Sequence, residues 1–384
     1  MLRKLHGNEE FRRHEFPATS REIFLAHAGV SPLPRRVAEA MRNYLETCAL
    51  TDQEEALPQG LLPGIRKKAS RLLGVSPEEI ALIGPTSTAI SVVALGLDLA
   101  PGERVLICGE DFPSNVYPWL ALRERGAIVE RIPTPALGRV EPEAVLEAMD
   151  GRTRLVAVSS AHFLSGWRTD IEALGRELNR RGALLCVDAI QSLGAFPLRA
   201  SCADFVAAGA HKWLLGPCGA GLLFVRKERQ ELLKPRAWGW HNVQCPDFIA
   251  QERIVYRDDA GRYEAGTPGL AGLAGLDAAL DLFLEIGQEA IAQDLRAKRR
   301  FLIDRLLGRG MEVLGADFPE SNAASIVSFR PRAEDPETAF KRLRRAKVRA
   351  SLRSDPKGRK YIRFAPHFYN TEAELDCAVE ALEA

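Results

Sequence analysis

The chain has 384 residues, of which 46% are hydrophobic and 27% are charged. A chain of this length can bury a sizeable core and is expected to divide into two domains. The formal net charge of +1 gives no electrostatic reason to expect a nucleic acid or an anionic membrane as a partner.

The N-terminal segment MLRKLHGNEEFRRHEF has no apolar core of the kind that a signal peptide needs. No run approaches the ~18 unbroken apolar residues that predict a membrane span. The seven cysteines include no CxxC pair, and several lie in apolar runs such as LLCVDA. We therefore expect a cytoplasmic protein with reduced thiols, without a disulfide framework and without a metal site.

Seven short apolar runs between residues 79 and 226 predict the strands of a large domain. They lie at 79–84, 104–109, 127–132, 154–161, 183–189, 203–209 and 219–225. Helical patterns separate the early runs, with capping-box spacing at Ser76–Glu79 and Thr169–Glu172. Continuous apolar strands joined by helices are typical of a mostly parallel sheet that is covered on both faces. The sequence predicts an α/β fold with a seven-stranded sheet.

The pattern changes after residue 270. A long amphipathic helical stretch covers 272–310, and strand-like segments at 323–329 and 360–366 alternate with helix starts at Asp335 and Thr371. We expect a large α/β domain over 17–269 and a smaller α+β domain over 270–384, joined by residues 1–16.

Polar residues stand where several of these runs end, and ligands of open α/β sheets bind beyond the carboxyl ends of the strands. Thr86 and Ser87 open a helix whose free N–H groups suit a phosphate, although such residues also serve as ordinary caps. Asp188 ends the fifth run, where it either meets a cation or caps the next helix. Lys212 follows the sixth run, either as a structural lysine or as a desolvated amine that attacks a carbonyl.

Together these residues match the needs of pyridoxal phosphate. The helix start would hold its phosphate, the carboxylate would keep its ring nitrogen protonated, and the lysine would hold its aldehyde as an imine. Phe112, after the second run, supplies a flat apolar partner for the ring. The chain has neither GxxxxGK nor a GxGxxG after its first strand, which disfavours the alternative of a nucleotide-dependent protein with a structural Lys212.

The motifs DAIQ at 188–191, HKW at 211–213 followed by Gly216-Pro217, and YEAGTPG at 263–269 carry a resemblance to a known family. The chain resembles class V aminotransferases, a branch of the fold-type I pyridoxal-phosphate enzymes that also contains cysteine desulfurases and isopenicillin-N-epimerase-like proteins. The similarity runs from IFLAHAGVSPLP near residue 23 to the final RFAPHFYNTEAELD.

The resemblance implies roles for the cofactor site. Lys212 would form the imine and shuttle a proton, Asp188 would pair with the ring nitrogen, and Gln191 would donate to the phenolic oxygen. His211, Thr86 and Ser87 would hold the phosphate, and His162 would lie near the ring. Thr267 would reach the phosphate of a neighbouring subunit, which implies a homodimer with shared sites.

The resemblance also implies an amino-acid substrate. Arg363 matches the arginine that grips the α-carboxylate, and His27 and Trp240 are expected on the substrate side, where an aromatic cluster in the dimer core is the alternative for Trp240. Arg168 and Arg262 are candidates for a side-chain carboxylate, with structural ion pairs as the alternative.

Two departures from the family pattern bear on the reaction. Phe112 stands where desulfurases usually have histidine, and the segment KVRASLRSDPKGRKYIRF, where they carry their nucleophilic cysteine, has none. We therefore expect transamination or epimerisation at the α-carbon. The alternatives are lyase-type β-elimination without the loop cysteine, with Cys245 as a replacement or as an ordinary loop cysteine, and a catalytically silent scaffold.

Overall fold

A seven-stranded sheet forms the centre of the computed structural model, which describes residues 1–383. Its strands are β2 (Ile80–Ala81), β3 (Arg104–Ile107), β4 (Ile128–Arg131), β5 (Thr153–Ser159), β6 (Leu184–Asp188), β7 (Phe205–Gly209) and β8 (Gly221–Val225). Their order is β2-β8-β7-β6-β5-β3-β4, and only the β2–β8 and β7–β8 pairs are antiparallel. Each predicted run supplies one strand, so the mostly parallel seven-stranded sheet is confirmed.

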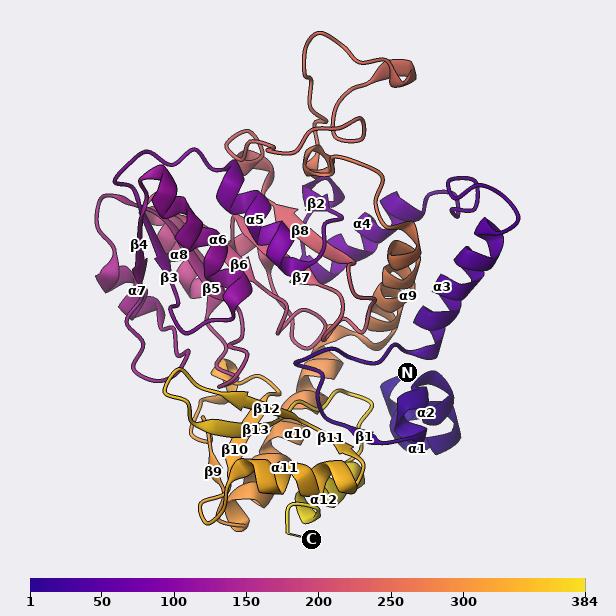
Figure 1. Cartoon of the computed structure of the whole chain (residues 1–384), viewed down its shortest axis with the longest axis vertical. Helices are drawn as coiled ribbons and strands as arrows, with labels where there is room; N and C mark the ends of the chain where they lie inside the picture. Colours follow the sequence, from indigo (N-terminus) through magenta and orange to yellow (C-terminus); the bar gives the residue numbers. More distant parts are fainter. Residues whose placement is uncertain (384) are drawn as a thin grey trace.

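Helices cover both faces of this sheet (Figure 1). They are α4 (Leu61–Leu73), α5 (Thr86–Gly96), α6 (Tyr117–Leu120), α7 (Pro142–Ala148), α8 (Ile171–Arg180) and α9 (Leu270–Ile286), and α3 (Arg35–Cys48) packs on α9. The strand residues alternate between two buried clusters: Val156 and Leu185 pack with α4, α8 and α9, whereas Leu155 and Leu184 pack with α5 and α6. Burial of both faces explains why the strands read as continuous apolar runs.

The C-terminal part contains an antiparallel sheet with the order β12-β13-β10-β9. Its strands are β9 (Glu312–Val313), β10 (Val327–Arg330), β12 (Ser351–Ser354) and β13 (Lys360–Phe364), and its helices are α10 (Gln288–Gly308), α11 (Pro336–Arg345) and α12 (Glu372–Glu380). The predicted long helix is two helices, because Gly287, at a φ of 89°, breaks it. The predicted start at Thr371 is confirmed, since Thr371 and Glu374 form a capping box. In contrast, α8 is capped by Asp170, whose side chain accepts from the N–H of Ala173, rather than by Thr169.

The N-terminal segment runs along the C-terminal part. α1 (Leu2–Gly7) and α2 (Glu9–Glu15) lie beside it (Figure 1), and β1 (Ile23–Phe24) pairs in parallel with β11 (Val348–Arg349). α9, for its part, packs against α3 and α4. The division at residues 269 and 270 stays a prediction. Within residues 1–383, no helix is both long and apolar enough to cross a membrane.

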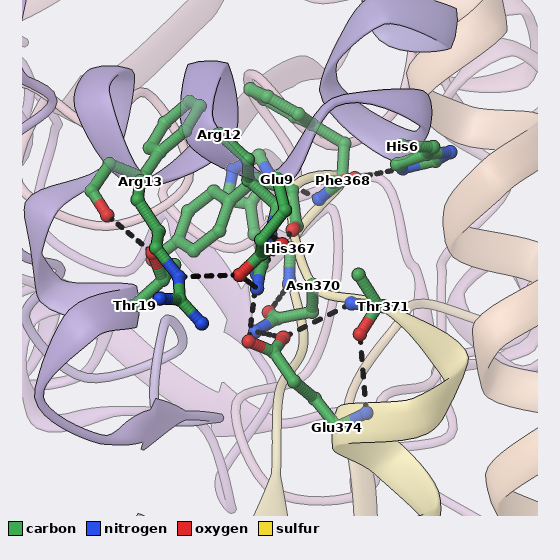
Figure 2. A network of polar contacts seen from close by, with 12 residues as sticks. His6, Glu9, Arg12, Arg13, Thr19, His367, Phe368, Asn370, Thr371 and Glu374 are labelled. Atoms are coloured by element: carbon green, nitrogen blue, oxygen red, sulfur yellow. Dashed lines mark hydrogen bonds and ion pairs between the residues drawn. The ribbon is translucent and has the colours of Figure 1, made fainter.

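The segment that follows β13 is held by a network of polar contacts (Figure 2). Arg12 of α2 donates to the carbonyl of Tyr369 at 3.2 Å and to the carboxylate of Glu374 at 2.7 Å. The same carboxylate accepts from the amide of Asn370 at 3.0 Å. Because Arg12 is 4% exposed, this ion pair is shielded from solvent and joins the two ends of the chain.

Substitution Arg12→Ala is expected to lower the thermal midpoint by several degrees, because it leaves the half-buried Glu374 without its cation at a cost of about 3 kcal/mol. Differential scanning calorimetry measures this shift. Arg13→Ala is the matched control, since Arg13 is exposed and pairs only with Glu9 of its own helix. Equal midpoints for the two variants would contradict a structural role for the Arg12 network.

Candidate active site

A cavity of about 340 Å³ lies at the carboxyl ends of β6 and β7, beside the start of α5. Most of the predicted site residues line it together. These are Thr86, Ser87, Phe112, Asp188, Gln191, His211, Lys212 and Arg363. Ala28, Gly29, Val30, Pro85, Ser114, Phe163, Ile190 and Arg353 complete the wall.

Lys212 enters this cavity from the loop after β7. The loop is held by Ser31, whose hydroxyl donates to the carbonyl of Lys212 at 2.7 Å and whose N–H donates to the carbonyl of His211 at 2.9 Å. Burial lowers the pKa of Lys212 to about 8, an effect that Asp188 opposes and Arg363 adds to. A larger neutral fraction at physiological pH makes this amine a better nucleophile and base than an exposed lysine.

One end of the cavity offers hydrogen-bond donors that nothing within residues 1–383 uses. His211 has a buried Nδ1 without a partner, and the N–H groups of Thr86 and Ser87, which open α5, have no backbone partner in the described part of the chain. The hydroxyl of Thr86 accepts from the N–H of Gly209 at 2.8 Å, which joins the start of α5 to the end of β7. A Cβ at Gly209 would lie 3.1 Å from that hydroxyl oxygen, so glycine permits the close approach. This end suits an anionic group with several acceptor oxygens.

Asp188 lines the cavity from the end of β6. Its carboxylate accepts from the N–H of Ile190 at 3.0 Å, and burial together with the nearby Asp111 raises its pKa to about 7. Gln191 stands one turn further on. Its oxygen accepts from the indole of Trp213 at 2.8 Å and its nitrogen donates to the carbonyl of Ala28 at 3.0 Å. The second N–H of this amide remains for a ligand.

Phe112 provides an aromatic wall. The centre of its ring lies 5.0 Å from the side-chain nitrogen of Lys212. The loop before it is fixed by Asp111, which accepts from Ser159 at 2.7 Å, from Asn115 at 3.0 Å and from the N–H of Phe112 at 2.7 Å. Sequence reasoning missed Asp111 and Ser159, although Asp111 follows one predicted strand and Ser159 lies within another. The sequence does not show the register of the strands. In the structure β5 pairs with β6 so that Ser159 lies beside Asp188.

Arg363 reaches the cavity from β13 of the antiparallel sheet. One of its terminal nitrogens donates to the carbonyl of Phe163 at 2.6 Å, while its Nε is buried without a partner in the described part of the chain. Burial, and then the neighbouring Arg353, lower its pKa to about 9. A guanidinium with free donors in a desolvated place is a receptor for a carboxylate.

Comparison with known proteins identifies the family to which the chain belongs. The family model "Aminotransferase class-V" matches residues 23–377. The chain belongs to the class V aminotransferase family.

Similar proteins include a probable cysteine desulfurase of Methanothermobacter thermautotrophicus, 31% identical over 97% of this chain and 96% of that protein. An isopenicillin N epimerase of Amycolatopsis lactamdurans is 28% identical over 92% of each chain. A solved structure of a C-DES variant with glycine covalently linked to its pyridoxal-phosphate cofactor has a TM-score of 0.88 and 22% identity, over 96% of this chain and 98% of that one.

Pyridoxal phosphate is the cofactor that the class V family implies, and the cavity fits it. The unpartnered donors of His211 and the start of α5 suit its phosphate, Asp188 suits its ring nitrogen, and Lys212 suits its aldehyde. The buried charge of Asp188 is otherwise without a cation at hydrogen-bond distance within residues 1–383, which a protonated ring nitrogen would provide.

Four residues predicted for this class V site do not line the cavity. His27 is fully buried, donates from Nδ1 to the carbonyl of Ala365 at 2.8 Å and contacts the Tyr369 hydroxyl through Nε2 at 2.7 Å. Burial lowers its pKa to about 3. His27 therefore does not line the cavity, and its expected contact with a substrate stays a prediction.

His162 lies beneath the Phe112 loop rather than in the cavity. Its Nδ1 accepts from the N–H of Ser165 at 3.1 Å, so its Nε2 donates to the carbonyl of Glu110 at 3.0 Å. Thr267 is exposed beside a different cavity. Trp240, 43% exposed, packs on His241 and Phe248 in the projecting segment, residues 237–258. His162 thus supports the loop that carries Phe112. The contact of Thr267 with a cofactor phosphate and that of Trp240 with a substrate would require a second subunit.

The raised pKa of Asp188 makes a prediction about the stability of the cofactor-free protein. Because the folded pKa of about 7 exceeds the unfolded value of about 3.9, Asp188 supports folding while it is protonated and loses this contribution as the pH rises through 7. Asp188→Asn should therefore raise the thermal midpoint by a few degrees at pH 8, and less as the pH falls to 5. Calorimetry on cofactor-free protein tests this.

The exposed Asp304 supplies the control for that comparison, since Asp304→Asn should leave the midpoint unchanged at every pH. An Asp188→Asn variant that is less stable than the parent at pH 8 would show that the carboxylate is already compensated without the cofactor.

Proposed function

We propose that the chain is a pyridoxal-phosphate-dependent enzyme that removes the α-proton of an amino acid. One observation carries this proposal: Lys212, with its lowered pKa, and Arg363, with its free donors, line the same buried cavity although they come from different sheets. Arg363 would bind the α-carboxylate and so present the α-carbon to the Lys212 amine.

The residues of the chain divide the work between binding and proton transfer. When bound, the cofactor supplies an electron sink for the charge left at the α-carbon. Asp188 would hold the proton on the ring nitrogen, His211 and the start of α5 would bind the phosphate, and Phe112 would shield one face from water. Lys212 would take the proton and return it.

This arrangement favours transamination over epimerisation. Among the residues that line the cavity, Lys212 is the one base on the substrate side, because Asp188 and His211 belong to the ring and phosphate ends. A single base that keeps the proton on one face suits transfer between neighbouring carbons. Epimerisation needs a proton donor on the opposite face, and none of the lining residues is an evident candidate.

Elimination of a β-substituent is the second candidate, because relatives of this chain carry the name cysteine desulfurase. It also needs a single base. No cysteine belongs to the described wall of the cavity, and Cys245 lies in the projecting segment, so the step would release the β-substituent without a protein-bound persulfide. A silent scaffold is the remaining alternative, against which the complete set of charged groups in the cavity argues.

Purified protein incubated with pyridoxal phosphate should exchange the α-proton of its substrate with deuterated water, as followed by NMR. Lys212→Ala should lose at least about 100-fold of this rate because the base is removed, while the exposed control Lys67→Ala should keep it. Arg363→Gln should raise the KM by roughly 30-fold or more, since a buried ion pair with the substrate is lost.

The products then distinguish the candidate reactions. Keto-acid formation that requires an acceptor keto acid indicates transamination, and release of the β-substituent without an acceptor indicates elimination. Absence of exchange with a full panel of amino acids would reject the enzymatic proposal and leave the scaffold.

We also propose that the protein is a homodimer. Residues 237–258 form a segment that projects from the large domain (Figure 1), and its apolar side chains are unusually exposed. They are Trp238, Trp240, Phe248, Ile249, Ile254 and Val255, with exposed fractions between 43% and 77%. Such a cluster on a projecting segment is typical of a protein–protein contact.

Sedimentation equilibrium tests the dimer. The parent protein should sediment as a dimer, and the pair of substitutions Phe248→Asp and Ile249→Asp should yield monomers that bind pyridoxal phosphate more weakly, because Thr267 would no longer reach the partner's cofactor. Leu307→Asp is the control, since Leu307 is 48% exposed on α10, away from this segment. A monomeric parent protein with full cofactor affinity would reject the shared site.

A further inference from the structure

A second arginine, Arg353, lines the cavity beside Arg363, and the family pattern gave it no role. Its one side-chain hydrogen bond goes to the carbonyl of Leu352 at 2.9 Å. Within residues 1–383, no carboxylate lies within 4.0 Å of its guanidinium. The neighbouring arginines differ, because Arg349 pairs with Glu22 at 3.1 Å and Arg359 pairs with Asp355 at 2.7 Å.

The register of the hairpin places the two cavity arginines on one face. Ser351 of β12 pairs with Arg363 of β13, and Arg353 pairs with Tyr361. Since side chains two residues apart share a face, Arg353 and Arg363 are diagonal neighbours, with β-carbons roughly 7–8 Å apart. Two guanidiniums on one rigid hairpin therefore face the same ligand.

Arg353 also stands at the mouth of the cavity. It lines an adjoining open groove together with Gly29 and Val30, which belong to both spaces. A side chain that extends from the cavity toward the groove would come near this guanidinium, because Arg353 lines both spaces. Arg353 and Arg363 are close enough to repel each other, since burial and then Arg353 lower the pKa of Arg363.

An α-carboxylate can balance the charge of only one of these arginines. We propose that Arg353 binds a second carboxylate, on the side chain of the substrate, and so makes the enzyme selective for acidic amino acids. This inference rests on the proposed function, in which Arg363 holds the α-carboxylate. Arg353 is then a specificity-determining residue whose stem can follow side chains of different length.

The arginines that the sequence suggested for this role are elsewhere. Arg262 is buried against Glu231 at 2.6 Å, and Arg168 lies on the ring of Phe196 at 4.4 Å. Neither belongs to the wall of the cavity. Apart from Arg363 and Lys212, Arg353 is therefore the one unpaired cation among the described residues of that wall that could bind the second carboxylate.

The test is equilibrium binding to the pyridoxal-phosphate-loaded protein, read as the change in the visible absorption of the cofactor. Aspartate and glutamate are compared with the neutral alanine and norvaline. The parent protein should bind at least one acidic amino acid about tenfold more tightly than its neutral counterpart, because a hydrogen-bonded ion pair is gained. Arg353→Gln should remove this preference and leave the Kd values of the neutral amino acids within about twofold.

Two further variants serve as controls. Arg353→Lys should retain part of the preference because the charge remains, and Arg359→Gln should retain all of it, because Arg359 lies at the turn of the same hairpin and pairs with Asp355. Equal affinity for acidic and neutral amino acids in the parent protein, or an unchanged preference in Arg353→Gln, would overturn the inference while leaving the proposed function intact. If no amino acid changes the absorption, the proposed function fails and the inference with it.

Discussion

The hydrogen bond between the His367 ring and the carbonyl of Trp213, 3.0 Å long, joins the two halves of the candidate active site. His367 follows the strand that carries Arg363, and Trp213 follows Lys212. Because Nδ1 of His367 accepts from the N–H of Phe368, its Nε2 must donate to Trp213. Burial keeps the pKa of this ring well below its usual value, so the neutral form and its single donor persist. The network around Arg12 holds the same segment from the other side (Figure 2).

This hydrogen bond holds together a cavity whose charged groups are largely buried. Lys212, Asp188 and Arg363 all have pKa values shifted toward their neutral forms, with burial as the main cause. Such shifts cost stability in the cofactor-free protein and are tolerated where function needs them. The charges of the cofactor and the substrate compensate those of the protein, so binding and stability are coupled at this site.

The sequence predicts the sheet better than it predicts the environment of single side chains. The seven strands were visible because burial of both faces makes each a continuous apolar run, and Asp188 and Lys212 were visible because they end such runs. The strand order was not visible in the sequence, since it depends on pairing between distant segments. His27 contacts a carbonyl 338 positions away, and no local pattern tells such a histidine from one that meets a ligand. Arg353 was missed for a related reason, because its importance lies in the absence of a partner and in the register of β12 with β13.

The segment at residues 26–31 has a consequence for how the protein is made. It is translated before the segments that it contacts, because Ser31 supports the Lys212 loop and His27 binds Ala365 and Tyr369, at least 338 positions later. The wall that these residues form around the cofactor cannot assemble on a partial chain. Contacts between such distant positions also slow folding. Completion of the cofactor site is therefore a late, post-translational event, and a nascent chain exposes this segment throughout its synthesis.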